Sequence, residues 1–473
     1  MVPADSEEGR LMSVQILVGP VEGLDRALAV VEAFDRVLIG GLMRPRPAQA
    51  AALADLADAV AASPLALLVA QAAEKTEAGT ASEEHFLALA AARTALLGAA
   101  HDALAQRVDE ATGRGRHTAE APAAPPVSET VPVNLLSAAR SWLCDVARAG
   151  WQGLDHDLAA GAAPVVAAML PDLGLRRLAV LLDGFAAELA ACCPGAAMDQ
   201  FPLRRWADLW TRGLLLAHPT YAPAIAERTV TGRLLPLGVD LQEHPTAAQA
   251  QVHAVLEPAD GSATRLVRVS VSTAKTDTIV GAGVWQLLRP HLSLLAAAAQ
   301  GRSVEVTAMP VTAEGDLLWS EALARTGAAA DPFATARVAL AGAEGGWKAP
   351  LDRHPAALAE PMFLEGYQAT EQDGDVVFTA GGHTLAVDVD RIPAACPLTL
   401  RSVTASTACI GLLRWDAGRF VLQPLAVTGR NATALHTSAW ADGTTDKDGI
   451  RAEKAATDAV QVLRERAGKL LRT

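Results

Sequence analysis

Two kinds of side chain are scarce in this sequence, aromatic rings and thiols. Of 473 residues, nine are Trp, two are Tyr, eight are Phe and five are Cys. Five scattered cysteines are too few for a disulfide framework. They include no CxxC pair, and no two histidines have the HxxxH spacing, so the paired ligands of a structural zinc site are lacking. We therefore expect neither a bound metal ion nor a cofactor.

Motifs for nucleotide binding and for nucleophilic catalysis are also lacking. There is no GxxxxGK[ST] loop, no GxGxxG fingerprint and no GxSxG elbow, and the glycines of Gly281–Gly283 do not have the fingerprint spacing. The neighbours Asp155, His156 and Asp157 would point in different directions on a helix, so we expect a polar helix start there and not a chelating site. No catalytic residue can be assigned, and an enzyme is the less favoured class.

Long apolar segments are missing as well. No stretch of about 18 apolar residues is free of charge, so we expect no transmembrane helix and no membrane partner. The start, MVPADSEEG, is acidic and does not have the basic and apolar regions of a secretory signal. Only six of the forty basic residues are lysine, which together with abundant alanine is typical of GC-rich bacterial genomes. We expect a bacterial cytoplasmic protein.

The net charge of −13 makes nucleic acid an unlikely partner, because phosphate binding needs clustered Lys and Arg. One segment departs from this balance. Residues 446–473 are predicted to form a helix that is locally basic, with Arg464, Lys469 and Arg472 among its cations. A nucleic-acid binder that uses this helix is therefore kept as one alternative.

Half of the residues are apolar, which is enough to build large cores, and the length predicts more than one domain. The first half has apolar residues at helical spacing, whereas short β-branched runs dominate from about residue 228. We expect an α+β protein in which helical bundles precede antiparallel β-rich modules with an inserted helix. The expected parts are a helical domain (1–112), a Pro/Ala-rich linker (113–133), a Trp-containing helical domain (134–227), a β-rich module with an inserted helix (228–350), a second β-rich module (351–445) and a C-terminal helix (446–473).

Two tryptophans four residues apart, Trp206 and Trp210, stand out in a chain so poor in aromatics. They share a helical stripe with Leu203 and Leu214. The favoured interpretation is that the indoles fill the core of an alanine-rich bundle. The alternative is a partner-binding surface, because Trp is enriched in interface hot spots. On the opposite stripe we expect Asp208 to pair with the neighbouring arginines of the same helix and to face solvent.

An enzyme of the hydrolase type remains a second alternative for the β-rich half. His, Ser and Asp residues are scattered through residues 240–390. A pocket that held His253 or His383 beside a carboxylate and a hydroxyl would favour the hydrolase hypothesis.

Four segments resemble parts of a group of actinobacterial proteins: WQGLDHDLAAG, LRRLAVLLDGFAAELAACC, PLRRWADLWTRGLLLAHP and GLLRWDAGRFVLQPLAVTG. Those proteins are encoded beside SWIM zinc-finger proteins and beside MoxR-type AAA+ ATPases paired with von Willebrand A domain proteins. The resemblance covers about residues 134–430 and includes no catalytic motif. This chain has no CxC…CxH ligands, so no zinc function carries over.

The resemblance implies an adaptor that works beside an ATPase. The sequence thus predicts a non-catalytic cytoplasmic interaction protein, with a MoxR-type AAA+ ATPase or a von Willebrand A domain protein as the partner.

Overall fold

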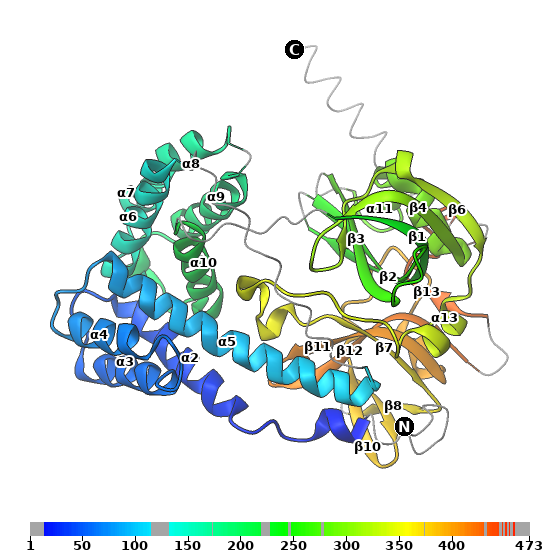
Figure 1. The fold of residues 1–473 in the computed structure, drawn as a ribbon, viewed down its shortest axis with the longest axis horizontal. Coiled ribbons are helices and arrows are strands. Elements are labelled where there is room, and N and C mark those ends of the chain that lie inside the picture. Colours follow the sequence, from blue (N-terminus) through cyan, green and yellow to red (C-terminus); the bar gives the residue numbers. More distant parts are fainter. Residues whose placement is uncertain are drawn as a thin grey trace, which may run out of the picture.

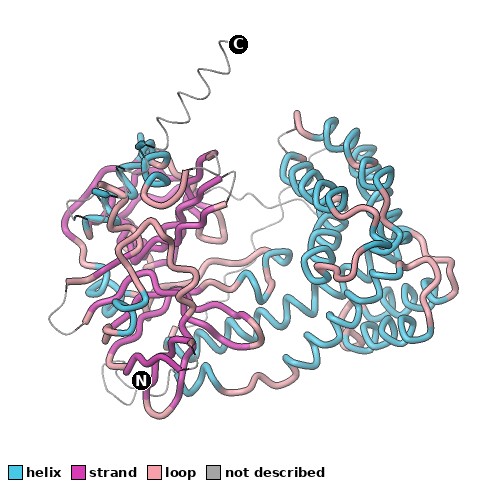
Figure 2. Tube along the Cα trace, turned by 180° about the vertical axis from the view of Figure 1, so that it is seen from behind, coloured by secondary structure: helices cyan, strands magenta, loops and turns pink. Residues whose placement is uncertain are grey.

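The structure is a computed structural model that describes residues 14–114, 132–172, 174–218, 228–244, 247–275, 279–372, 374–429 and 433–443, with the single residues 447, 450, 451, 454, 457 and 458. The expected linker (113–133) and the expected C-terminal helix (446–473) lie almost entirely outside these ranges. The described chain forms a helical lobe and a β lobe (Figures 1 and 2). The predicted α+β class, with helices first and sheets second, is confirmed.

The helices before residue 218 share one hydrophobic core. Phe34 and Phe86 from the first segment pack in the same cluster as Trp151 and Phe185 from the second. Described residues of the two expected helical segments therefore share one core, and we call this part of the structure the helical lobe. Its helices are α2 (Leu24–Gly40), α3 (Pro47–Ala59), α4 (Ala66–Glu77), α5 (Glu83–Thr112), α6 (Val133–Ala149), α7 (His156–Ala160), α8 (Ala163–Met169), α9 (Arg176–Ala191) and α10 (Leu203–Leu216).

Two glycines allow the first and second segments to touch. Gly41 ends α2 with a φ of 82°, and Gly150 ends α6 with a φ of 69°. A Cβ atom on Gly41 would lie 2.4 Å from the carbonyl oxygen of Arg148. Because no side chain fits at this distance, glycine is required at the crossing. The amide of Leu42 donates to the carbonyl of Ala147 at 2.8 Å and joins the two segments.

Trp206 and Trp210 lie in this core, with exposed fractions of 1% and 0%. The Trp206 ring meets the ring of Trp151 edge to face at 5.5 Å, and Trp210 Nε1 donates to the carbonyl of Leu143 at 3.0 Å. The structure therefore supports the core interpretation. Neither indole is exposed on the surface, as the partner-binding alternative for these two residues would require.

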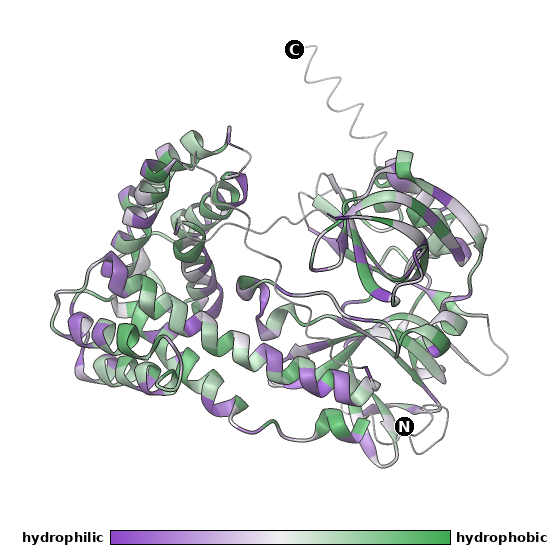
Figure 3. Cartoon of the chain, in the orientation of Figure 1, coloured by the Kyte–Doolittle hydropathy of each residue, from purple (hydrophilic) through white to green (hydrophobic). Residues whose placement is uncertain are grey.

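Helix α5 belongs to both lobes. Its first half contributes Phe86 and Leu89 to the helical core, whereas Leu104 and Val108 in its second half pack against the β lobe. Figure 1 shows the helix running from the bundle to the sheets, and in Figure 3 hydrophobic and hydrophilic residues alternate around its second half. At about 1.5 Å per residue, its 30 residues span about 45 Å.

The first sheet closes into a small barrel. The strands pair in the order β1-β2-β3-β5-β4, and β4 pairs again with β1; β6 extends the sheet from β4. Helices α11 and α12 lie between β3 and β4 in the chain. The elements are β1 (Arg228–Glu243), β2 (Ala247–Pro258), β3 (Arg265–Ala274), α11 (Gly283–Leu287), α12 (Leu292–Gln300), β4 (Arg302–Val311), β5 (Asp316–Leu317) and β6 (Ala324–Ala329).

The long strand β1 makes this closure possible. Residues 228–234 pair with β4 and residues 232–243 with β2, and the register shifts at Val230/Gly232 and at Pro236/Gly238. Bulges of this kind bend a strand. The strand order, the parallel pair β3–β5 and the helix between β3 and β4 are those of the OB-fold barrel. The parallel pair departs from the expected antiparallel module, because the chain crosses the barrel before it enters β5.

The second sheet follows the order β7-β11-β12-β10-β9-β8, with β13 paired to β12. Pairing is antiparallel except between β10 and β12. The predicted hairpin at WDAGRF is confirmed, since Trp415 faces Phe420 across a turn in which Ala417 and Gly418 have positive φ. The elements are α13 (Pro332–Ala339), β7 (Glu360–Glu365), β8 (Gln368–Gln372), β9 (Asp375–Ala380), β10 (His383–Val387), α14 (Leu400–Thr404), β11 (Ala408–Asp416), β12 (Arg419–Thr428) and β13 (Leu435–His436).

Replacement of Trp206 by Ala should destabilise the protein strongly. The substitution would leave a cavity between Trp151 and Phe201, whose rings both contact the Trp206 ring. We expect a loss of about 3–5 kcal/mol in the free energy of unfolding, measured by urea denaturation. The control is Val338→Ala on α13, where the side chain is 83% exposed and the loss should stay within about 0.5 kcal/mol. Equal unfolding curves for the two variants would contradict the core assignment.

Candidate functional site

A connector, residues 345–359, joins the two β modules and lies against the helical lobe. Arg212 of α10 reaches it with Nη1 at 2.8 Å from Asp352 Oδ1 and with Nη2 at 2.8 Å from the carbonyl of Leu351. Arg353 of the connector points the other way, with Nη1 at 3.2 Å from Asp102 Oδ2 on α5. The connector is thus held to α10 and α5 by charged groups of both signs.

Beneath the connector, Arg93 of α5 is buried with an exposed fraction of 1%. Its Nε and Nη2 donate to the two carboxylate oxygens of Asp35 at 2.6 and 3.0 Å, and its Nη1 lies 2.6 Å from Asp208 Oδ1. Asp208 thus pairs with Arg93 of α5 and not, as we expected, with the arginines of its own helix, and its side chain is only 31% exposed. Burial alone would raise the pKa of Asp208, but His354 and Arg93 outweigh burial and lower it.

A cavity of about 270 Å³ lies between α5, α10 and the connector. His354 Nδ1 accepts a hydrogen bond from the amide of Ala356, so a neutral imidazole carries its proton on Nε2, 3.4 Å from Asp208 Oδ1. The residues around this cavity are Arg93, Thr94, Leu97, Asp208, Thr211, Arg212, Leu351, Arg353, His354, Ala356 and Ala357.

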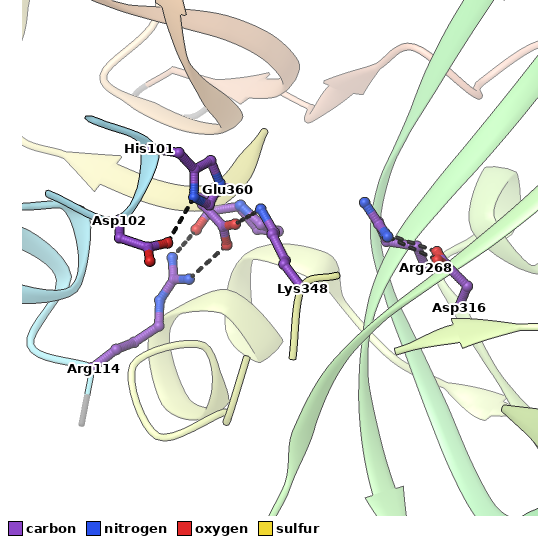
Figure 4. A network of polar contacts seen from close by, with 8 residues as sticks. His101, Asp102, Arg114, Arg268, Asp316, Lys348 and Glu360 are labelled. Carbon is purple, nitrogen blue, oxygen red and sulfur yellow. Dashed lines mark hydrogen bonds and ion pairs between the residues drawn. The ribbon is translucent and has the colours of Figure 1, made fainter. Parts of the chain in front are cut away.

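Glu360, at the start of β7, anchors the far end of the connector. It accepts from Lys348 Nζ at 2.9 Å, and Arg114 Nη1 lies 3.4 Å from its other oxygen (Figure 4). Arg114 also donates to the carbonyl of Pro361. Burial alone would raise the pKa of Glu360, but Lys348, Arg114 and Arg268 outweigh burial and hold it at about 2. The carboxylate therefore stays charged between the lobes.

A larger and more open hollow, of about 570 Å³, lies on the outer face of the barrel. Arg268 of β3 and Asp316 of β5 form a bidentate pair there, with Nε–Oδ1 and Nη2–Oδ2 distances of 2.8 Å (Figure 4). The surrounding residues come from β2, β3, β5 and the chain that follows β5: Gln251, Arg268, Ser270, Asp316, Leu317, Leu318 and Trp319.

The barrel and the second sheet meet at a buried carboxylate, Asp240 of β1. Arg414 Nη2 and Gln423 Nε2, from β11 and β12, donate to it at 2.9 and 2.8 Å, and Gln242 Nε2 donates at 2.9 Å. Arg414 Nε also donates to Gln423 Oε1 at 2.6 Å. These donors satisfy both oxygens of the buried carboxylate and fix the two sheets relative to each other.

The histidines named for a hydrolase lie apart. His253 of β2 is enclosed between the sheets with an exposed fraction of 1%, so a substrate cannot reach it in this conformation. Burial first, and then repulsion from Arg268, lowers the pKa of His253 to about 4. His383 is the half-buried first residue of β10. Neither histidine is among the residues that line the two hollows described above.

The other candidate ligands have local roles. Asp155 caps α7, since its Oδ1 accepts from the amide of Leu158 at 2.7 Å, which confirms a polar helix start. All five cysteines are described, and each is a free thiol, including the neighbours Cys192 and Cys193. Gly281–Gly283 leads into α11.

Among the described residues, no group of three or more His, Cys, Asp or Glu side chains could hold a metal ion. No helix in the same ranges is long and apolar enough to cross a membrane.

An uncharged segment covers the outside of the hairpin formed by α3 and α4. No charged residue occurs between Asp58 and Glu74. Leu67 and Leu68 on α4 have exposed fractions of 85% and 57%. The exposed residues of this segment, which we call the α4 strip, are Ala59, Ala61, Ala62, Pro64, Leu67, Leu68, Ala70 and Gln71.

Sequence reasoning missed the charged residues that hold the lobes together. Asp35 and Arg93 are 58 positions apart, and Arg114 and Glu360 are 246 apart. Within its own segment, none of these four residues differs from a charged residue on the surface.

Comparison with known proteins adds no identification: no family model, no curated protein and no solved structure matches the chain.

We expect two buried groups, His253 and Glu360, to make the free energy of unfolding depend on pH, each in its own pH range. Folding lowers the pKa of His253 from 6.5 to about 4 and that of Glu360 from 4.5 to about 2. In both cases the unfolded chain takes up the proton first, so stability is lost as the pH falls. We expect the free energy of unfolding to fall between pH 6.5 and 4 for His253, and between pH 4.5 and 2 for Glu360, with slopes up to about 1.4 kcal/mol per pH unit for each group.

Urea denaturation at a series of pH values will measure these slopes. His253→Gln should flatten the upper window and Glu360→Gln the lower one, so that each variant is the control for the other. An unchanged slope in the corresponding window would show that the group does not titrate as its surroundings require.

Proposed function

We propose that this chain is a non-catalytic interaction protein whose docking surface is the α4 strip. The exposure of Leu67 and Leu68 carries the proposal. Single exposed leucines are common on protein surfaces, but adjacent ones within an uncharged segment of this length are typical of contact surfaces. The alanines and the proline beside them are small, so a partner could approach the helix closely.

The charges around the strip indicate the chemistry of the partner. Four exposed acids flank the strip, Asp55 and Asp58 before it on α3 and Glu74 and Glu77 after it on α4, against one half-buried cation, Lys75. A surface with an apolar centre and a basic rim complements this arrangement, because opposite charges steer association and fix orientation. The proposed partner is therefore a protein with such a surface.

We infer the identity of the proposed partner from the sequence resemblance. It points to a MoxR-type AAA+ ATPase, or to the von Willebrand A domain protein paired with it, in a bacterial cytoplasm. The chain would then act as an adaptor that brings the ATPase to its target.

The test is a binding measurement with purified proteins. The chain is titrated with the MoxR-type ATPase of the same organism and, separately, with the von Willebrand A domain protein. We expect a complex with one of them, and we expect Leu67→Glu with Leu68→Glu to weaken it about tenfold or more, which is about 1.4 kcal/mol. Both side chains are exposed, so the variant should fold normally.

The matched control is Val338→Glu on α13, which places one glutamate at an apolar position of the β lobe that is about as exposed as Leu67. It should bind like the wild type. Wild-type affinity of the double variant would disprove the α4 strip as the docking surface. Failure of both candidate proteins to bind would disprove the adaptor role beside an ATPase.

A further inference from the structure

We infer that the cavity between α5, α10 and the connector is a binding site for a free aliphatic α-amino acid. The inference concerns a different surface from the α4 strip and does not depend on the adaptor role. The cavity has a volume of about 270 Å³. Because a cavity of about 150 Å³ can accept benzene, this volume is enough for a small amino acid. The lining side chains then decide which groups of a ligand are recognised.

The floor of the cavity carries more negative than positive charge. Arg93 contacts two carboxylates, since its guanidinium lies 2.6 Å from both Asp35 Oδ1 and Asp208 Oδ1. His354, which lies 3.4 Å from Asp208, adds no positive charge, because its Nδ1 accepts a hydrogen bond from the amide of Ala356. One guanidinium therefore faces two carboxylates in a buried place. A primary ammonium group beside Asp208 would supply the missing positive charge.

Thr211 offers a second contact for this ammonium group. It follows Asp208 by three residues on α10, so the two side chains share one face of the helix and both line the cavity. Thr211 is only 3% exposed, and its Oγ1 has no hydrogen-bond partner among the described residues. In contrast, the hydroxyl of Thr94 on the opposite wall donates to the carbonyl of Ala90. A buried hydroxyl without a partner is costly, and an ammonium donor would satisfy it.

Two arginines on the connector side can receive a carboxylate of the same ligand. Arg353 donates from Nε to the carbonyl of Lys348 and from Nη1 to Asp102, which leaves the hydrogens of Nη2 for another acceptor. Arg212 uses Nη1 and Nη2 for the connector, which leaves Nε. Both guanidinium groups line the cavity, whereas their carboxylate partners do not. This side of the cavity is therefore positive.

These opposite charges select a zwitterion. A simple anion would be repelled by Asp208 and a simple cation by Arg212 and Arg353, whereas an α-amino acid has an attractive contact at each end. The remaining wall is apolar and consists of Leu97, Leu351, Ala356 and Ala357. Since no further charged group is available for the side chain of the ligand, an aliphatic side chain fits this wall best.

The experiment titrates the full chain with leucine and valine in a calorimeter. Two analogues of leucine separate its charges: isoamylamine has no carboxylate, and isocaproate has no ammonium group. We expect leucine or valine to bind with a Kd in the millimolar range or below. Each analogue should bind about tenfold more weakly or worse, because it keeps only one of the two charged contacts.

Variants of the floor test the assigned contacts. Asp208→Asn should weaken the binding about tenfold or more, and Thr211→Val should weaken it to a smaller extent. The matched control is Asp145→Asn on α6, which removes an exposed carboxylate that pairs with Arg148 of the same helix and does not line the cavity. It should bind like the wild type.

Three results would overturn the inference: neither amino acid binds at millimolar concentration, either analogue binds as tightly as leucine, or Asp208→Asn and Thr211→Val both keep the wild-type affinity. Circular dichroism of each variant confirms that it is folded before its affinity is compared. Valine has the shape of threonine, and Thr211 Oγ1 has no partner to lose, so Thr211→Val keeps the test decisive if Asp208→Asn does not fold.

Discussion

The packing of one helix in two cores is the constraint on which the rest of the structure depends. The first half of α5 is buried among the helices, with Phe86 and Leu89 in their core, and its second half supplies Leu104 and Val108 to the core of the second sheet. Because α5 is one continuous helix of 30 residues with a part in each core, it sets the separation of the two lobes. The polar contacts of the connector then only have to hold the lobes in an arrangement that α5 already imposes.

Those polar contacts nonetheless determine what lies between the lobes. Arg93 is neutralised by Asp35 and Asp208, and Glu360 is neutralised by Lys348 and Arg114. Because buried charges are costly unless they are paired, each partner restricts where the others can be. The same region contains the Arg268–Asp316 pair, which contributes to the electrostatic surroundings of Glu360 and also lines the hollow of the barrel (Figure 4).

The sequence predicted the parts of the fold that depend on local patterns. Helical spacing located Trp206 and Trp210 on an apolar stripe, and β-branched runs located the strands. What it could not predict depends on residues far apart in the chain. The stripe of Asp208 looked solvated because nothing in its own helix shows that α5 packs there. The barrel closes because β1 pairs with both β2 and β4. In the sequence, only glycines mark the two register shifts that permit this pairing. The hollow beside Trp319 could not be predicted because the residues that line it come from three strands.

The position of α5 also has a consequence for the order in which the protein is made. Val108 packs in the same cluster as Val376, which follows it by 268 residues. At about 5–20 residues per second, the ribosome needs tens of seconds to deliver the strands that cover the second half of α5. During this time the helical lobe can already be complete, since its last helix ends at Leu216. Leu17 and Leu24, which belong to the same cluster and precede α5 in the chain, are the apolar partners then available to shield it. These N-terminal residues are thus synthesised long before the strands that complete the same cluster.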